Sequence, residues 1–363
     1  MNATKAITAS KIFTGNGWLV NHALIITNDV IDAVVPVESL PKEIEQVYHE
    51  GMLVPGFIDL QIYGAYNHLF ATEPTAESLF KLQDYCAKGG AAYFLPTVAT
   101  NTIKVILDCI DAIKEYWAHG GIGVIGLHIE GPWINKEKRG AHIEALIHPP
   151  TLDAVRAILT AGKGVIKIIT LAPEVCSREV VEYIQSQGVI VSAGHSNATY
   201  EQATDAFETG INVATHLFNA MSSLGHRAPG MVGAIFNHPS VMASIIPDGF
   251  HVDFAAVSIA KKIMKERLFI ITDAVTETAK GLYPHQLNGE KYESEGVLSG
   301  SALTMAKAVK NCVEKAGIPL EESLRMASLY PAKVLGINHR LGKIETGFEA
   351  AFTKLDSQLR VVE

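Results

Sequence analysis

The stretch LVPGFIDL at residues 53–60 is the first of eight apolar runs that recur along most of the chain. The other seven are AAYFLPTV (91–98), GVIGLHIE (123–130), VIKIITLA (165–172), GVIVSAGH (188–195), INVATH (211–216), VMASIIPDG (241–249) and LFIITDAV (268–275). Nearly continuous apolar runs are typical of parallel strands that helices cover on the outer face. The runs therefore predict a parallel sheet of eight strands.

Amphipathic stretches separate these runs and have the spacing of helices. The clearest of them occupy residues 75–89, 102–120, 152–162, 178–188 and 199–210. Each of the five ends at or beside a glycine, the residue that commonly terminates a helix. Alternation of eight strands with helices predicts an α/β fold, a (β/α)8 TIM-like barrel over residues 52–339.

The two ends of the chain have a different sequence pattern from the barrel. AITASKIFTG (6–15) and its neighbours break into short strands at Gly, Asn, Asp and Pro, and LGKIETGFEAAFTKLD (341–356) is strand-like with glycine turns. We expect residues 1–51 and 340–363 to join into one small β-sandwich domain beside the barrel. A length of 363 residues suits one large barrel with such an appendage.

Composition excludes several classes of partner. The net charge of −8 gives no basic footprint for nucleic acid or an anionic membrane, and no apolar stretch is long enough to span a bilayer. The N-terminus has no secretory signal pattern. The four scattered cysteines argue against a disulfide framework or a thiolate metal site, so we expect a cytoplasmic location.

Polar residues stand where the apolar runs end. In a barrel of this kind the C-terminal ends of the strands converge on one site. Any one of these residues alone is more commonly a structural residue, but the set together favours a functional site: Gln61, Glu130, His195, His216, His251 and Asp273.

One carboxylate and two imidazoles in this set suit a metal ion. Glu130, His195 and His216 match the ligands of Zn²⁺ or a similar divalent ion with an open position for water. Asp273 is the candidate base that accepts a proton from this water and returns it to a leaving amine. The alternative for Asp273 is the N-cap of a helix.

Longer stretches carry a family resemblance. They are PGFIDLQIYG (55–64), GLHIEGPWINKEKRGAH (126–142), SAGHSNATY (192–200), ATHLFNAMS (214–222), PDGFHVD (247–253), ITDAV (271–275) and LSGSALTM (298–305). They occur in this order along a chain that resembles the N-acetylglucosamine-6-phosphate deacetylases of the amidohydrolase superfamily, and the resemblance covers nearly the whole chain. The resemblance implies metal-dependent hydrolysis of an N-acetylated amino-sugar phosphate to acetate and the free amino sugar.

The resemblance also implies residue roles. It gives Glu130, His195 and His216 as metal ligands, Asp273 as general base and acid, and His251 as a second catalytic residue that contacts the N-acetyl carbonyl. The implied substrate-binding residues are Gln61, Ala141, His142, Asn219, Ala220, Arg227, His251, Leu303, Thr304 and Met305. Arg227 resembles a phosphate-binding arginine that the neighbouring subunit supplies, which implies a homodimer; the alternative is a solvated surface charge.

One departure from the wider superfamily concerns the number of metals. Many members carry His-x-His at the end of the first strand, where this chain has Asp59 and Gln61. We therefore expect one divalent ion per subunit, Zn²⁺ above others, with His68 as a weak candidate to compensate. The alternatives are the same reaction on N-acetylgalactosamine 6-phosphate, a cyclic-amide hydrolase with two metals, and a non-catalytic sugar-phosphate sensor.

Overall fold

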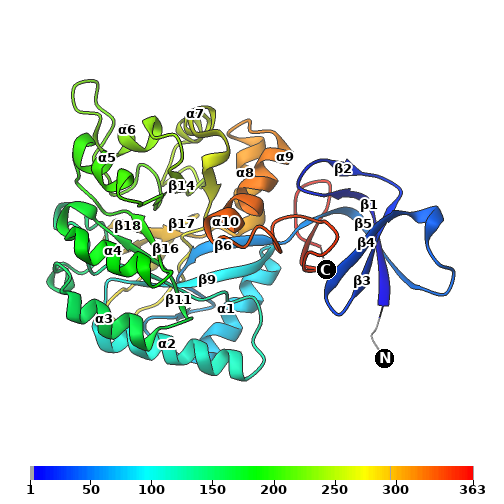
Figure 1. The fold of residues 1–363 in the computed structure, drawn as a ribbon, viewed down its shortest axis with the longest axis horizontal. Coiled ribbons are helices and arrows are strands. Elements are labelled where there is room, and N and C mark those ends of the chain that lie inside the picture. Colours follow the sequence, from blue (N-terminus) through cyan, green and yellow to red (C-terminus); the bar gives the residue numbers. More distant parts are fainter. Residues whose placement is uncertain (1–3, 295, 363) are drawn as a thin grey trace.

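The barrel is the larger part of the computed structural model, which describes residues 4–294 and 296–362 (Figure 1). Eight parallel strands follow one another in the order β15-β14-β13-β12-β11-β10-β9-β6. They are β6 (Phe57–Ile62), β9 (Ala91–Ala99), β10 (Leu127–Glu130), β11 (Ile166–Leu171), β12 (Ile190–Ala193), β13 (Val213–Ala214), β14 (Met242–Ile245) and β15 (Leu268–Ile270). Each strand overlaps one of the eight apolar runs, so the predicted barrel is confirmed.

The first and last strands meet through the segment that follows β15. Asp273 N donates to Gln61 O at 2.9 Å, and Tyr63 N donates to Ala274 O at 2.9 Å. These bonds close the ring of strands. They also bring the end of β6 beside Asp273, although more than 200 residues separate the two in the sequence.

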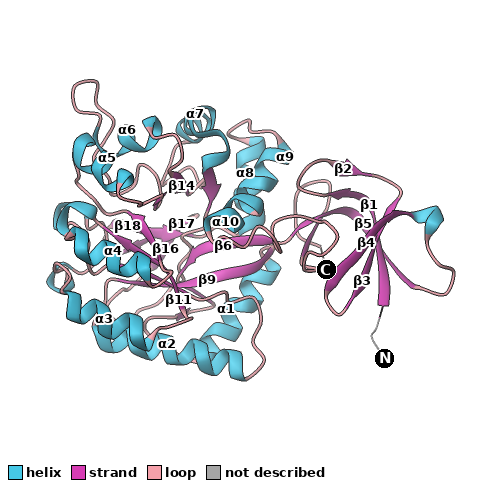
Figure 2. Cartoon of the chain, viewed as in Figure 1, coloured by secondary structure: helices cyan, strands magenta, loops and turns pink. Residues whose placement is uncertain are grey.

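Helices cover the outside of the barrel (Figure 2). They are α1 (Ala76–Lys88), α2 (Ile103–Ala118), α3 (Leu152–Ala161), α4 (Arg178–Ser186), α5 (Tyr200–Glu208), α6 (Gly230–Asn237), α7 (Phe254–Met264), α8 (Met305–Glu314), α9 (Leu320–Ala327) and α10 (Leu329–Val334), with short 3-10 turns η1 (Val37–Ser39), η2 (Lys136–Lys138), η3 (Glu144–Leu146), η4 (Pro173–Val175) and η5 (Lys265–Arg267). The five predicted helices are confirmed as α1 to α5. No helix in the described ranges is long and apolar enough to cross a membrane.

Side-chain caps explain why these five helices begin where they do. Thr75, Thr102, Thr151, Ser177 and Thr199 each accept a hydrogen bond from a backbone N–H in the first turn. At α5, Gln202 also bonds back to the backbone N–H of Thr199, which completes a capping box. Each such cap stabilises a helix by about 1 kcal/mol.

The small β domain contains strands from both ends of the chain. They are β1 (Thr4–Phe13), β2 (Trp18–Leu19), β3 (His22–Thr27), β4 (Val30–Pro36), β5 (Glu45–Pro55) and β19 (Phe352–Leu355), in the order β19-β5-β1-β3-β4 with β2 on β1. Ile12, Leu24, Ile31 and Leu53 form its own core. Only Gly56 separates β5 from β6. Both termini thus build one small β domain, while its exact boundaries at 51/52 and 339/340 stay a prediction.

Two short antiparallel sheets at the barrel end were not predicted. β7 (Gly64–Ala65) pairs with β8 (His68–Leu69), and β16 (Gln286–Asn288), β17 (Lys291–Ser294) and β18 (Val297–Ser301) form a three-stranded sheet. Ser301 N donates to Asp273 O at 3.0 Å, which attaches β18 to the seam of the barrel. The three-stranded sheet therefore stands beside the C-terminal ends of the strands.

Candidate active site

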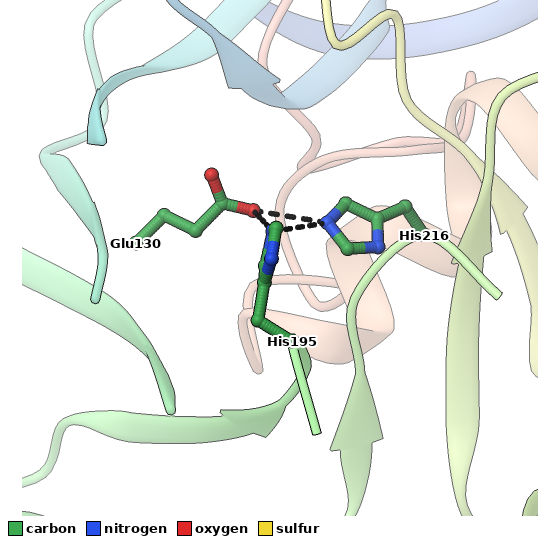
Figure 3. Close-up of side chains that lie close together, drawn as sticks. All are labelled: Glu130, His195 and His216. Carbon is green, nitrogen blue, oxygen red and sulfur yellow. Dashed lines mark hydrogen bonds and ion pairs between the residues drawn. The ribbon is translucent and has the colours of Figure 1, made fainter. Parts of the chain in front are cut away.

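Three buried ligand groups converge at the C-terminal ends of β10, β12 and β13 (Figure 3). Glu130 is the last residue of β10, and His195 and His216 each stand two residues beyond β12 and β13. His216 Nε2 lies 3.0 Å from Glu130 Oε1 and 3.1 Å from His195 Nε2. The predicted carboxylate and imidazoles therefore form one cluster, with ligand atoms within 4.8 Å of one another.

The backbone turns sharply at each strand end to aim these side chains inward. His195, His216 and Asp273 have φ values of +47°, +37° and +55°. A positive φ is unfavourable for residues other than glycine. Residues keep this left-handed conformation where the surrounding structure stabilises it, often at functional sites. At His216 that support includes Ser244 Oγ, which accepts the backbone N–H at 2.7 Å.

The donor set fits a divalent cation. His195 Nδ1 lies 2.8 Å from the carbonyl oxygen of Lys138, so Nδ1 carries the proton and Nε2 offers its lone pair to the cluster. Burial opposes the ionisation of Glu130, but His195 and the other neighbouring imidazoles hold its pKa well below the usual range. Burial lowers the pKa of His216, yet bonds to Glu130 raise it overall. Both directions indicate a site that favours positive charge between the ligands.

Asp273 lies beside this cluster. Its Oδ1 accepts a hydrogen bond from Gln61 Nε2 at 2.8 Å, and its Oδ2 lies 3.8 Å from His251 Nε2. Burial raises its pKa. His251 Nδ1 is held by Asp248 Oδ2 at 2.6 Å, so Nε2 points toward Asp273. A carboxylate with a raised pKa is suited to accepting and returning a proton.

Asp59 supports the base from behind, a role that sequence reasoning missed. Its carboxylate accepts bonds from Thr272 N at 3.1 Å, Thr272 Oγ1 at 2.5 Å and Gln61 N at 3.2 Å. Burial raises the pKa of Asp59 to about 7. The buried carboxylate thereby fixes the backbone on both sides of the barrel seam.

Most of the predicted site residues line one pocket at this end of the barrel. Those that do are Glu130, Ala141, His142, His195, His216, Asn219, Ala220, His251 and Asp273. Gln61 lies immediately behind the pocket wall through its bonds to Glu130 and Asp273. The pocket also has polar lining residues that no strand-end pattern marks: Tyr63, Thr97, Tyr283, His285 and Ser299.

The remaining predicted residues lie outside this lining. Leu303 and Met305 are buried, and Thr304 caps α8 through its side chain. Arg227 is exposed on the loop before α6. His68, the candidate to compensate for the missing histidines, instead contacts Glu73 Oε2 at 2.5 Å and Lys81 Nζ at 2.6 Å.

His142 contacts the metal-ligand carboxylate. Its Nδ1 accepts a hydrogen bond from Thr100 N at 3.3 Å, and its Nε2 lies 3.2 Å from Glu130 Oε2. Burial, followed by the charge of His195, lowers the pKa of His142 to about 4. The ring is therefore neutral at pH 7, with its proton on Nε2 directed at Glu130.

Comparisons with known proteins agree with this geometry. The amidohydrolase family model matches residues 52–361, and the model of the NagA composite domain matches residues 6–54. N-acetylglucosamine-6-phosphate deacetylase of Haemophilus influenzae is 36% identical over 93% of this chain and 91% of its own length. N-acetylgalactosamine-6-phosphate deacetylase of Escherichia coli O157:H7 is 32% identical over 99% and 97%.

A solved structure extends the likeness to three dimensions. The crystal structure of N-acetylglucosamine-6-phosphate deacetylase from Pasteurella multocida superposes with a TM-score of 0.94 at 35% identity, covering 99% of this chain and 97% of that one. The family model, the similar sequences and the similar structure all indicate the same family. The chain belongs to the amidohydrolase family, in the group that contains the amino-sugar-phosphate deacetylases.

Proposed function

We propose that the protein hydrolyses the acetamido group of an N-acetylated amino-sugar phosphate, with N-acetylglucosamine 6-phosphate as the substrate and glucosamine 6-phosphate and acetate as products. One observation carries this proposal: the cluster of Glu130, His195 and His216 lies beside the buried carboxylate of Asp273 in one pocket. A metal site with an adjacent proton acceptor can activate water and polarise the carbonyl group for hydrolysis of an unactivated amide.

The metal site would hold one divalent ion per subunit, with Zn²⁺ as the favoured metal. Its ligands would be Glu130 Oε1, His195 Nε2 and His216 Nε2. Such an ion, when bound, lowers the pKa of water and polarises a carbonyl group. Gln61 supports the single-metal proposal because its side-chain nitrogen points at Glu130 and Asp273, and an amide N–H group cannot bind a cation.

Asp273 would carry out both proton transfers, and His251 would stabilise the developing negative charge. Asp273 takes a proton from the water molecule whose oxygen attacks the acetyl carbonyl carbon. The same proton then passes to the sugar nitrogen as the carbon–nitrogen bond breaks, which leaves acetate and a free amine. Asp248 holds His251 Nδ1, and in its doubly protonated form His251 would donate a hydrogen bond from Nε2 to the carbonyl oxygen as negative charge develops on it.

The phosphate group would bind at the opposite end of the substrate. Asn219 and Ala220 line the pocket, and Ala220 has a φ of +50°. Arg227 is exposed and outside the pocket of its own chain, so we propose that it serves the site of a second subunit in a homodimer. The exposed apolar side chain of Leu224, three residues before Arg227 in the sequence and 56% accessible, supports an interface at this loop.

The main alternative substrate is N-acetylgalactosamine 6-phosphate, which differs in its configuration at C4 of the sugar. Relatives named for each of the two sugar phosphates are similar to the chain over most of its length. Acetate release with the two sugar phosphates in competition tests the preference, and a cyclic amide such as dihydroorotate tests the other reaction class. Preferential release from N-acetylglucosamine 6-phosphate is the expected result. Hydrolysis of the cyclic amide alone would contradict the proposal. We expect the reaction to take place in the cytoplasm.

A further inference from the structure

Tyr63 is a pocket residue without a part in the proposed reaction. It directly follows β6, is 8% exposed and lines the pocket. Its hydroxyl group donates to Glu130 Oε2 at 2.5 Å and accepts from Gln61 Nε2 at 2.7 Å. The hydroxyl therefore contacts the Glu130 oxygen that does not face His195 and His216.

The two oxygens of Glu130 have separate partners. Oε1 lies 3.0 Å from His216 Nε2 and 3.3 Å from His195 Nε2. Oε2 accepts from Tyr63 Oη at 2.5 Å and lies 3.2 Å from His142 Nε2. Tyr63 Oη and His142 Nε2 thus contact Oε2, whereas Oε1 faces Nε2 of His195 and of His216 and accepts one hydrogen bond from Gln61 Nε2 at 2.9 Å.

We infer that Tyr63 is a positioning residue which, together with His142, occupies Oε2 so that Glu130 offers a metal ion only Oε1. This inference rests on the proposed metal-dependent function. A carboxylate that binds through both oxygens takes up one more coordination position than a carboxylate that binds through one. Holding back Oε2 keeps that position available for water or the acyl oxygen.

Gln61 links this arrangement to the base. Its Nε2 lies within hydrogen-bond distance of three oxygens, which share its two N–H donors: Tyr63 Oη, Glu130 Oε1 at 2.9 Å and Asp273 Oδ1 at 2.8 Å. A shift of the Glu130 carboxylate would therefore disturb Asp273 as well. Partners of this kind around a metal ligand affect metal affinity and activity by about 10–100-fold when they are removed.

The alternative is that Tyr63 only fills space. Its ring packs with Leu69, Val275 and Tyr283 in a small apolar cluster. Tyr63→Phe keeps the ring and removes only the hydroxyl group, so it separates the two roles. Tyr330→Phe is the matched control, because the buried hydroxyl of Tyr330 on α10 also donates to a carboxylate, Glu322 Oε1 at 2.7 Å, and lies outside the pocket lining.

The experiment compares wild type, Tyr63→Phe and Tyr330→Phe after substitution with Co²⁺. The visible absorption spectrum reports the coordination of the ion, and competition with a chelator gives its dissociation constant. We expect Tyr63→Phe to change the cobalt bands and weaken binding by about 10-fold or more. Tyr63→Phe should also lower kcat more than it raises KM. Tyr330→Phe should match wild type in the cobalt spectrum, the dissociation constant and both kinetic constants. An unchanged spectrum and affinity in Tyr63→Phe would overturn the inference.

Two features keep the outcome decisive. The spectrum and affinity do not require turnover, so a protein that binds Co²⁺ but releases no acetate would contradict the proposed function without touching the role of Tyr63. If Tyr63→Phe failed to fold, His142→Leu and His142→Gln would test the same oxygen from its other donor. Gln retains an N–H group and should preserve the spectrum better than Leu; equal spectra in the two variants would overturn the inference.

Discussion

Gln61 Nε2 donates a hydrogen bond to Asp273 Oδ1 at 2.8 Å across the seam where the first and last strands of the barrel meet. The neighbouring backbone bond from Asp273 N to Gln61 O fixes the same two residues. The bonds that close the barrel therefore also fix the position of the proposed base, Asp273. The metal ligands reach this point from the intervening strands, so the complete site exists only in the closed barrel.

Replacement of Asp273 by Asn tests its role as base and acid. The amide keeps the size of the side chain but cannot accept a proton, so we expect kcat to fall by about 10²- to 10⁴-fold. Metal content, measured by elemental analysis on the same preparation, should stay at the wild-type value because Asp273 is outside the ligand cluster. Turnover close to wild type would exclude Asp273 as the base.

A mixture of two impaired variants tests whether Arg227 acts across subunits. Arg227→Ala should raise KM strongly through loss of phosphate binding, and Asp273→Asn should lower kcat. When the two are refolded or co-expressed together, a mixed dimer has one site with the intact Asp273 of one subunit and the intact Arg227 of the other. We expect activity with a near wild-type KM in the mixture. If Arg227 served its own subunit, mixing would restore nothing.

Much of this arrangement is predictable from local sequence features. The eight apolar runs and the capping residues Thr75 and Ser177 determine strands and helices through short-range periodicity and hydrogen bonding. Because the C-terminal ends of barrel strands converge, the positions of Glu130, His195 and His216 after their apolar runs suffice to predict that they share one site.

Other features depend on contacts that no local pattern encodes. The strands β16 and β17 are exposed or half-buried, so they lack the alternation that marks a strand beside a core. The bond from Tyr63 to Glu130 joins residues 67 apart and exists only because the ends of β6 and β10, on either side of β9, meet in the barrel. The environment of Asp59 likewise depends on Thr272 from the far side of the seam.

The raised pKa of Asp59 predicts a pH dependence of stability. Burial moves it from the ordinary value of 3.8 to about 7, so the folded state favours the protonated form. Stability from this group is therefore full below about pH 4 and is lost as the pH rises through 7, by up to about 4 kcal/mol. Asp59→Asn should remove this slope, measured as urea midpoints at pH 5 and pH 8.

The matched control for that experiment is Asp153→Asn, since the side chain of Asp153 is 97% exposed. The control should keep the pH dependence of the wild-type protein. A slope that is the same in Asp59→Asn and wild type would show that Asp59 does not change its protonation on folding.

The most direct test of the central claim measures acetate release from N-acetylglucosamine 6-phosphate and metal content on one sample, before and after chelation. We predict about one divalent ion per subunit, loss of release on chelation, and recovery on addition of Zn²⁺. Release that continues in metal-free protein would contradict the metal-dependent reaction. If fully metallated protein released no acetate, N-acetylglucosamine 6-phosphate would be excluded as the substrate, and other N-acylated sugars would be the next to test.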